Sequence, residues 1–136
     1  MKSTEDIEDT EYTEKEYPYS TITDKIIKCA IEVHKTFGPG FVEGIYENAL
    51  IYELKKNGLR VEQQKLIDVK YKGECVGEHR LDLLVEDTVI VENKTVTEFN
   101  DIHFAQILSY LKATEKKIAL SLNFADTKIQ VKRVIL

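Results

Sequence analysis

The chain has 136 residues, of which 43% are hydrophobic, so it is long enough for one domain with a core of ordinary size. This composition excludes intrinsic disorder over most of the chain, and its short apolar runs fall far below the roughly 18 residues needed to span a bilayer. The formal net charge is −5, and the acidic N-terminal segment lacks the apolar core of a secretory signal. We therefore expect a soluble cytoplasmic protein without membrane association, whose two distant cysteines, Cys29 and Cys75, are reduced thiols.

Residues 1–20 differ in charge from the rest of the chain. They carry seven acidic side chains and two lysines, whereas residues 21–136 carry 17 acidic and 17 basic side chains and are neutral. Because the segment has no sustained hydrophobic period, we expect a flexible acidic tail, with docking of its tyrosines on the domain or on a partner as the alternative. A single domain then covers residues 21–136, and its neutrality counts against tight nucleic-acid binding.

Two helices are predicted after the tail. From Thr21 the apolar residues recur with helical spacing, Thr23 is a plausible N-cap, and Gly38-Pro39-Gly40 ends the pattern because proline cannot continue a helix. A second helix is predicted over residues 42–57, with Gly58 as its C-terminal cap. Cys29 lies on the apolar face of the first helix, so we expect a core thiol and not a nucleophile.

The period then changes from helical to alternating. Strands are predicted around residues 67–71, 81–85 and 89–91, separated by turns at Lys72-Gly73 and Glu86-Asp87.

A third helix and two more strands complete the chain. The helix is capped by Asn100 or Asp101, and the strands cover residues 118–124 and about 129–134. The predicted order is ααβββαββ. Because a crossover helix usually joins parallel strands, we expect an α/β (α+β) domain with a mixed central sheet flanked by helices.

Three ionisable residues of the central hairpin form the strongest candidate for a site. Glu92 and Lys94 share one side of their strand, and a hairpin closing at Glu86-Asp87 brings Asp82 within about a residue of Glu92. On an exposed face this trio would be an ordinary ladder of ion pairs. The continuously apolar neighbours at residues 89–91 favour burial instead, where two carboxylates need a cation, and Mg²⁺ is the natural one.

Two motifs carry a resemblance to a known family. Asp82, followed after nine residues by Glu92-Asn93-Lys94, resembles the D-x(n)-[D/E]-x-K signature of the PD-(D/E)XK nuclease superfamily. The segment from Gly40 to Tyr46 is similar to the pattern that names the GxxExxY proteins, a bacterial and archaeal group assigned to that superfamily. The resemblance extends over residues 22–136 and implies a nuclease-like fold.

The resemblance also implies roles for individual residues. It makes Asp82 and Glu92 metal ligands and Lys94 the catalytic lysine, and it adds a glutamate from a helix, for which we prefer Glu43 over Glu47. A charge favourable to the helix dipole is the alternative for Glu43.

Two further residues match the QxxxY element that borders the site in RecB-like nucleases. Gln106 and Tyr110 lie one turn apart on the third helix, and a capping or packing role is the alternative for both. His103 lies three residues before Gln106 and is more typical of a surface histidine. The sequence departs from the superfamily at Asn93, where an apolar residue is common, and a buried asparagine there would need hydrogen-bond partners.

Two functions follow from these features. The first is a nuclease that uses Mg²⁺ (or Mn²⁺) to hydrolyse phosphodiester bonds in DNA or RNA. The second is a non-catalytic binding or assembly module that keeps the nuclease-like fold, which the acidic tail and the neutral domain favour. A homodimer or a local basic patch would offset that neutrality; the patch residues would be Lys112, Lys116, Lys117, Lys128, Lys132 and Arg133.

Overall fold

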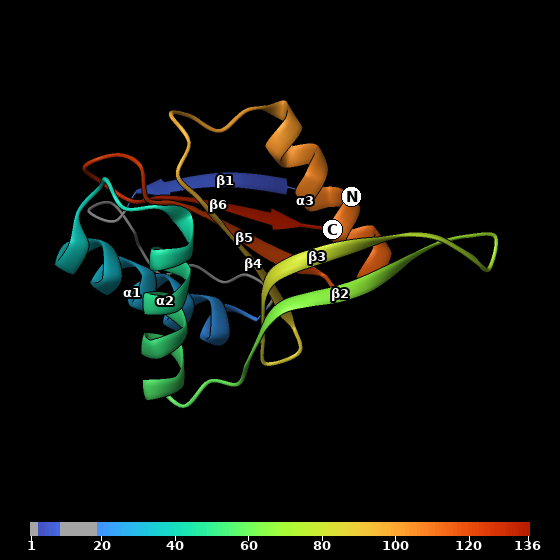
Figure 1. Cartoon of the computed structure of the whole chain (residues 1–136), viewed down its shortest axis with the longest axis horizontal. Helices are drawn as coiled ribbons and strands as arrows, with labels where there is room; N and C mark the ends of the chain where they lie inside the picture. The colour runs from blue at the N-terminus through green and yellow to red at the C-terminus, as the bar shows by residue number, and fades with distance from the viewer. Residues whose placement is uncertain (1–2, 9–18) are drawn as a thin grey trace.

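The structure is a computed structural model that describes residues 3–8 and 19–136, with side chains described from Tyr19 onward (Figure 1). Within these residues the chain forms three helices and one six-stranded sheet. In chain order the elements are β1 (Ser3–Glu8), α1 (Ser20–Phe37), α2 (Glu43–Lys56), β2 (Val61–Tyr71), β3 (Glu74–Val85), β4 (Val89–Lys94), α3 (Asp101–Thr114), β5 (Ile118–Asn123) and β6 (Gln130–Ile135).

The sheet is mixed, with the strand order β1-β6-β5-β4-β3-β2. Its only parallel pair among the described strands is β4 with β5, which α3 connects; every other neighbouring pair is antiparallel. The predicted crossover helix and mixed α/β sheet are therefore confirmed.

Helices α1 and α2 cover one face of the sheet and build the larger part of the core. Their apolar side chains pack on alternate residues of the central strands, including Leu83, Val91 and Leu120, which are fully buried. Tyr46 of α2 stacks on Phe124, with ring centroids 4.6 Å apart and an interplanar angle of 11°. Cys29 is buried in this core as predicted, and burial, with the nearby charge of Glu53, raises the pKa of its thiol to about 11.

Helix α3 covers the opposite face with a smaller core. Ile107, Tyr110 and Leu111 pack against Leu84 and Ile90 of the central hairpin. The helix begins as predicted, because the Asn100 side chain accepts hydrogen bonds from the backbone N–H groups of Ile102 and His103. The His103 side chain accepts in return from the Asn100 backbone, so this histidine completes the cap.

Strands β2 and β3 form a long hairpin that extends beyond the rest of the sheet (Figure 1). Its outer part is exposed, including Leu66, Tyr71 and Val76. The pairing of β2 with β3 skips Gln64, whose φ is +51°, so the strand is irregular opposite Asp82. This irregularity lies beside the candidate site.

Several boundaries differ from the sequence-based expectations. Helix α1 begins at Ser20, one turn before Thr23, so the prediction of Thr23 as its N-cap is wrong. Thr23 is instead buried, where its hydroxyl donates to the carbonyl of Ser20 and receives a hydrogen bond from the buried Arg133. Strand β2 begins at Val61, six residues before the predicted strand. The sequence does not predict this start because residues 62–65 are polar, lie on a sheet edge and carry no alternating pattern.

The N-terminal segment contributes a strand. Residues Ser3–Glu8, which belong to the predicted acidic tail, form β1 and pair antiparallel with β6 over its full length. A strand at a sheet edge has a neighbouring strand on one side only, and edge strands often carry charged residues, so its sequence need not alternate in hydrophobicity. Residues 9–18 of the predicted tail lie outside the described part. No helix among the described residues is long and apolar enough to cross a membrane.

Candidate active site at the open end of the central hairpin

The candidate site begins where the ladder between β3 and β4 stops. The backbone pairing runs from Val85 with Val89 to Leu83 with Val91, so Asp82 and Glu92 come next on opposite strands. The backbone N–H of Asp82 donates to Glu92 Oε2 at 3.0 Å, and the N–H of Asn93 donates to Asp82 Oδ2 at 2.9 Å. Two carboxylates thus take the acceptor positions that backbone carbonyls hold in the rest of the hairpin.

Burial and like charge act together on these two carboxyl groups. Glu92 is only 3% exposed, and desolvation, reinforced by the charge of Asp82, raises its pKa to about 8. The pKa of Asp82 is also raised, first by burial, although the hydrogen bond from Asn93 opposes the rise. Burial therefore makes the charged forms of both carboxyl groups costly in the absence of a cation.

Lys94 supplies the nearest positive charge. It lies at the end of β4, and its charge lowers the pKa of both Asp82 and Glu92 as well as that of Glu43, against the larger effect of burial. Its Nζ donates to the side-chain oxygen of Gln106 on α3 at 3.4 Å. The backbone carbonyl of Lys94 accepts from the N–H of Phe124, which fixes the end of β4 against the segment after β5.

Tyr110 forms a wall of the site one helical turn after Gln106. It is buried, and burial together with the charges of Glu92 and Asp82 raises the pKa of its phenol to about 12. Tyr110 is therefore neutral near pH 7. Gln106 contacts Lys94 and Tyr110 lies within the electrostatic influence of Glu92 and Asp82, while the described contacts of His103 are with the cap of α3 and the ring of Phe99.

The N-terminal half of α2 brings two more carboxylates. Glu47 is buried, and its Oε2 accepts hydrogen bonds from the side-chain amides of Gln63 at 2.7 Å and Gln64 at 3.0 Å. Glu43 lies in the first turn, where burial raises its pKa and the backbone of Thr95 and the charge of Lys94 oppose the rise. The charge of Glu47 raises the pKa of Asp82, Glu92 and Glu43, so all four carboxylates share one electrostatic environment.

The loop before α2 explains why glycine and tyrosine flank Glu43 in the sequence. Gly40 has a φ of +116°, which side chains rarely adopt, and this lets the chain turn sharply into the helix. The buried hydroxyl of Tyr46 donates to the carbonyl of Gly38 and accepts from the N–H of Phe41 at 3.2 Å. Tyr46 therefore ties the loop to the core while Glu43, one turn earlier, lies beside β4.

Carboxylates are the ligand type that Mg²⁺ prefers, but in this structure they do not converge on one position where an ion could contact them all. Across the described part of the chain, no group of three His, Cys, Asp or Glu side chains is arranged to hold a metal ion. Asp82, Glu92 and Glu47 each use an oxygen on an N–H donor instead. Burial is the main cause of the raised pKa values of Asp82, Glu92 and Glu43, and a divalent cation would favour their charged forms, so the residues fit such an ion chemically.

Sequence reasoning missed two groups that support the site. Gln63 and Gln64 hold Glu47 from a strand that the alternating pattern did not reveal. Their adjacency in a polar segment is a weak signal, because amide side chains are common on exposed strands. Asn93, in contrast, was singled out, and its side chain is fully buried with neither Oδ1 nor Nδ2 hydrogen-bonded to any described residue.

A mixed sheet whose central hairpin ends in carboxylates beside a lysine, with helices on both faces, defines a nuclease-like α/β protein. The sequence profile of the PD-(D/E)XK nuclease superfamily matches residues 20–134, and the chain belongs to this superfamily. Comparisons with curated proteins and with solved structures give no significant match.

Proposed function

We propose that the protein is a metal-dependent nuclease that hydrolyses phosphodiester bonds in nucleic acid. The observation that carries this proposal is that Asp82, Glu92, Glu43 and Glu47 share one partly buried electrostatic environment, in which Lys94 acts on three of them. So many carboxylates with one ammonium group are costly to bury unless a cation completes the site. Membership of a nuclease superfamily supports the same activity.

In this proposal Asp82 and Glu92 hold a Mg²⁺ or Mn²⁺ ion, and Glu43 or Glu47 completes the ligand set. The bound ion would supply a Lewis acid for the phosphate and an activated water. Lys94 orients that water or stabilises the negative charge that develops on the phosphate, and Gln106 keeps its ammonium group in place. Tyr110, which is neutral and buried, limits access of solvent to Glu92.

We also propose that the chain belongs to the GxxExxY group within the superfamily. The support is the distinct task of each residue that names the pattern: Gly40 turns the chain, Glu43 faces β4, and Tyr46 anchors the loop. A homodimer and a cytoplasmic location remain predictions from the sequence.

The test is cleavage of labelled DNA and RNA, single- and double-stranded, with Mg²⁺, with Mn²⁺ and with EDTA. We expect metal-dependent cleavage that falls by on the order of a hundredfold or more in Asp82→Asn, Glu92→Gln and Lys94→Ala. Glu74→Gln is the matched control, because it removes an exposed carboxylate from the far end of β3. Cleavage that persists unchanged in Glu92→Gln and Lys94→Ala contradicts the assignment.

A non-catalytic binding module is the second candidate, and one observation favours it. The carboxylates of Asp82 and Glu92 already have backbone N–H partners, so the site has a stable arrangement without an ion. A melting experiment separates the two functions. If the protein is a metal-dependent nuclease, Mg²⁺ or Mn²⁺ raises its melting temperature, and this rise disappears in Asp82→Asn. If it is a non-catalytic module, neither ion changes the melting temperature.

A further inference from the structure

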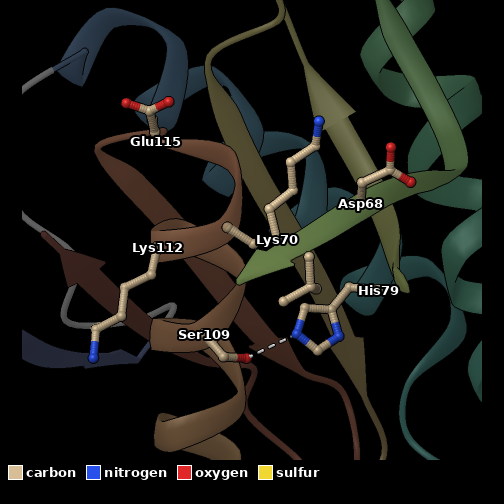
Figure 2. A pocket seen from close by; sticks show the side chains of 8 residues that line it. Asp68, Lys70, His79, Ser109, Lys112 and Glu115 are labelled. Atoms are coloured by element: carbon tan, nitrogen blue, oxygen red, sulfur yellow. Dashed lines mark hydrogen bonds between the residues drawn. The ribbon is translucent and has the colours of Figure 1, made fainter. Parts of the chain in front are cut away.

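A cleft separate from the carboxylate cluster lies between the hairpin of β2 and β3 and the outer half of α3. Its volume is about 740 Å³, within the range of roughly 300–1,000 Å³ typical of pockets that enclose a small organic ligand. Figure 2 shows Asp68, Lys70 and His79 on the strand side, and Ser109, Lys112 and Glu115 on the helix side. Of the residues that line this cleft, only Lys112 belongs to the basic patch predicted from the sequence.

The hydrogen bonds in the cleft fix the orientation of one imidazole. The Ser109 hydroxyl donates its single proton to the Gln106 carbonyl at 2.7 Å, and it lies 3.3 Å from His79 Nε2 (Figure 2). In the tautomer that agrees with this arrangement, Ser109 Oγ accepts from His79 Nε2–H. His79 Nδ1 then carries no proton and can accept a hydrogen bond.

The cleft is joined to the candidate active site through α3. Gln106 accepts from Lys94 with its side chain and from Ser109 with its backbone carbonyl. The ring of His79 meets the ring of Tyr110 edge to face, with centroids 4.7 Å apart, and Tyr110 senses the charges of Glu92 and Asp82. Gln106 and Tyr110 therefore connect residues of the cleft with residues of the carboxylate cluster.

The charges of the cleft indicate what it would bind. Lys70 and Lys112 are balanced by Asp68 and Glu115, so the cleft offers cations for a phosphate together with acceptors for neutral N–H and O–H groups. Val69 and Ala113 add apolar surface. A nucleotide combines an anion, hydroxyls and a flat base with polar edges, whereas a bare run of phosphates would be repelled by the two carboxylates.

We propose that this cleft binds one nucleotide of a single nucleic-acid strand, adjacent to the phosphate that is cut. The inference rests on the proposed nuclease function. His79 contacts the sugar or base through its ring and Nδ1. Lys70 and Lys112, whose side chains extend in different directions (Figure 2), each contact a phosphate of the strand. The strand is single because a pocket of this size, walled by a hairpin and a helix, takes a nucleotide-sized group and not a stacked pair within a duplex.

The experiment measures binding and cleavage separately. A short single-stranded oligonucleotide with a fluorescent label is titrated with the full chain in EDTA, where the proposed reaction does not run, and anisotropy gives the affinity. We expect Lys112→Glu and Lys70→Glu each to weaken binding by about tenfold, because each reverses a charge at a phosphate. Lys56→Glu, at the C-terminal end of α2 on the other face of the sheet, is the matched control and stays within about twofold of the original chain.

His79→Ala tests the neutral contact, with a melting curve to confirm that each variant is folded. We expect weaker binding in His79→Ala with a salt dependence unlike that of Lys112→Glu, since no charge contact with phosphate is lost. Equal binding by the original chain, Lys112→Glu and Lys70→Glu, no binding of the single strand, or equal affinity for a duplex of the same sequence overturns the inference.

The proposed function fails by a different result, namely no metal-dependent cleavage of any nucleic acid by the original chain. Binding that depends on Lys112 but is never followed by cleavage supports nucleotide binding in the cleft and contradicts the nuclease function. Cleavage that is unchanged in Lys112→Glu and Lys70→Glu supports the nuclease function and contradicts the nucleotide-binding role of the cleft.

Discussion

The two ends of the β3–β4 pair are built from the same strands in opposite ways. At the closed end, from Leu83 to Val91, apolar side chains are buried on both sides of the sheet and backbone groups form the ladder. At the open end, carboxylates replace backbone acceptors, and Asp82 and Glu92 face each other where the next pair of apolar residues would lie. The closed end holds the strands in register, and this register brings the carboxyl groups of Asp82 and Glu92 together at the open end.

This difference separates residues that stabilise the fold from residues that serve the site. A substitution at the closed end should cost stability, whereas a neutral isostere at the open end should cost activity and relieve repulsion. The following predictions test that division.

Leu83→Ala should have the largest effect on stability. The side chain is fully buried between the sheet and the α1–α2 face, and removing it leaves a cavity that costs about 2–5 kcal/mol of unfolding free energy. Urea denaturation followed by circular dichroism measures this loss. Leu66→Ala, on the exposed part of β2, is the control and should change stability by less than about 0.5 kcal/mol.

Glu92 should make the metal-free protein less stable as the pH rises. Its pKa in the folded state is about 8, above its ordinary value of 4.5, so the folded protein keeps a proton that the unfolded chain has lost. The stabilisation is complete below pH 4.5 and is lost as the pH rises through 8, with a slope of up to about 1.4 kcal/mol per pH unit. Denaturation in EDTA across this range measures it, and Glu92→Gln should show a flatter curve.

Parallel curves for the original chain and Glu92→Gln would mean that Glu92 is ionised in the fold. Divalent metal adds a second comparison. Because a bound cation favours the carboxylate, saturating Mg²⁺ should reduce the loss at high pH in the original chain and leave Glu92→Gln unchanged.

Tyr46→Phe should loosen the loop before α2 without emptying the core. The ring can still stack on Phe124, but the hydroxyl that bonds Gly38 and Phe41 is lost, which should cost about 1–3 kcal/mol because the partners are partly buried. Activity should fall more than stability suggests, since Glu43 follows this loop. Thermal melting and cleavage rates at a temperature well below the melting point separate the two effects, and an unchanged rate would remove the link to Glu43.

Asn93→Val should stabilise the protein, by about 1 kcal/mol. The amide of Asn93 is fully buried and neither of its polar atoms has a hydrogen-bond partner among the described residues, while valine is favourable in a central strand. Ser121→Ala, which removes a buried hydroxyl without a hydrogen-bond partner among the described residues on the neighbouring strand, is the matched variant and should give a smaller gain. A loss of stability in Asn93→Val would mean that a ligand or an ordered water satisfies the amide.

The sequence was sufficient for the parts of the site that depend on local rules. A tight turn at Glu86-Asp87 and a period of two fix the register of the hairpin, so the approach of Asp82 to Glu92 follows directly. Asn100 was also recognisable as a cap, because its side chain satisfies donors within the next three residues.

Interactions between distant segments were not predictable in this way. Strand β1 and the first half of β2 lie at sheet edges, where polar sequences carry no alternation, and they were missed as strands. The contact of Ser109 with His79 joins residues 30 apart in sequence, through a hairpin whose length sets where it meets α3. No period or motif encodes such a meeting.

Phe124 contacts two segments that carry residues of the candidate active site, the end of β4 and the helix α2. Its N–H holds the carbonyl of Lys94, and its ring lies flat on Tyr46, whose hydroxyl secures the turn ahead of Glu43. A displacement of this one aromatic residue would shift the amine and the helix glutamate in concert and not singly. The distance between the Lys94 amine and the Glu43 carboxyl group therefore depends on a buried residue that substrate does not contact.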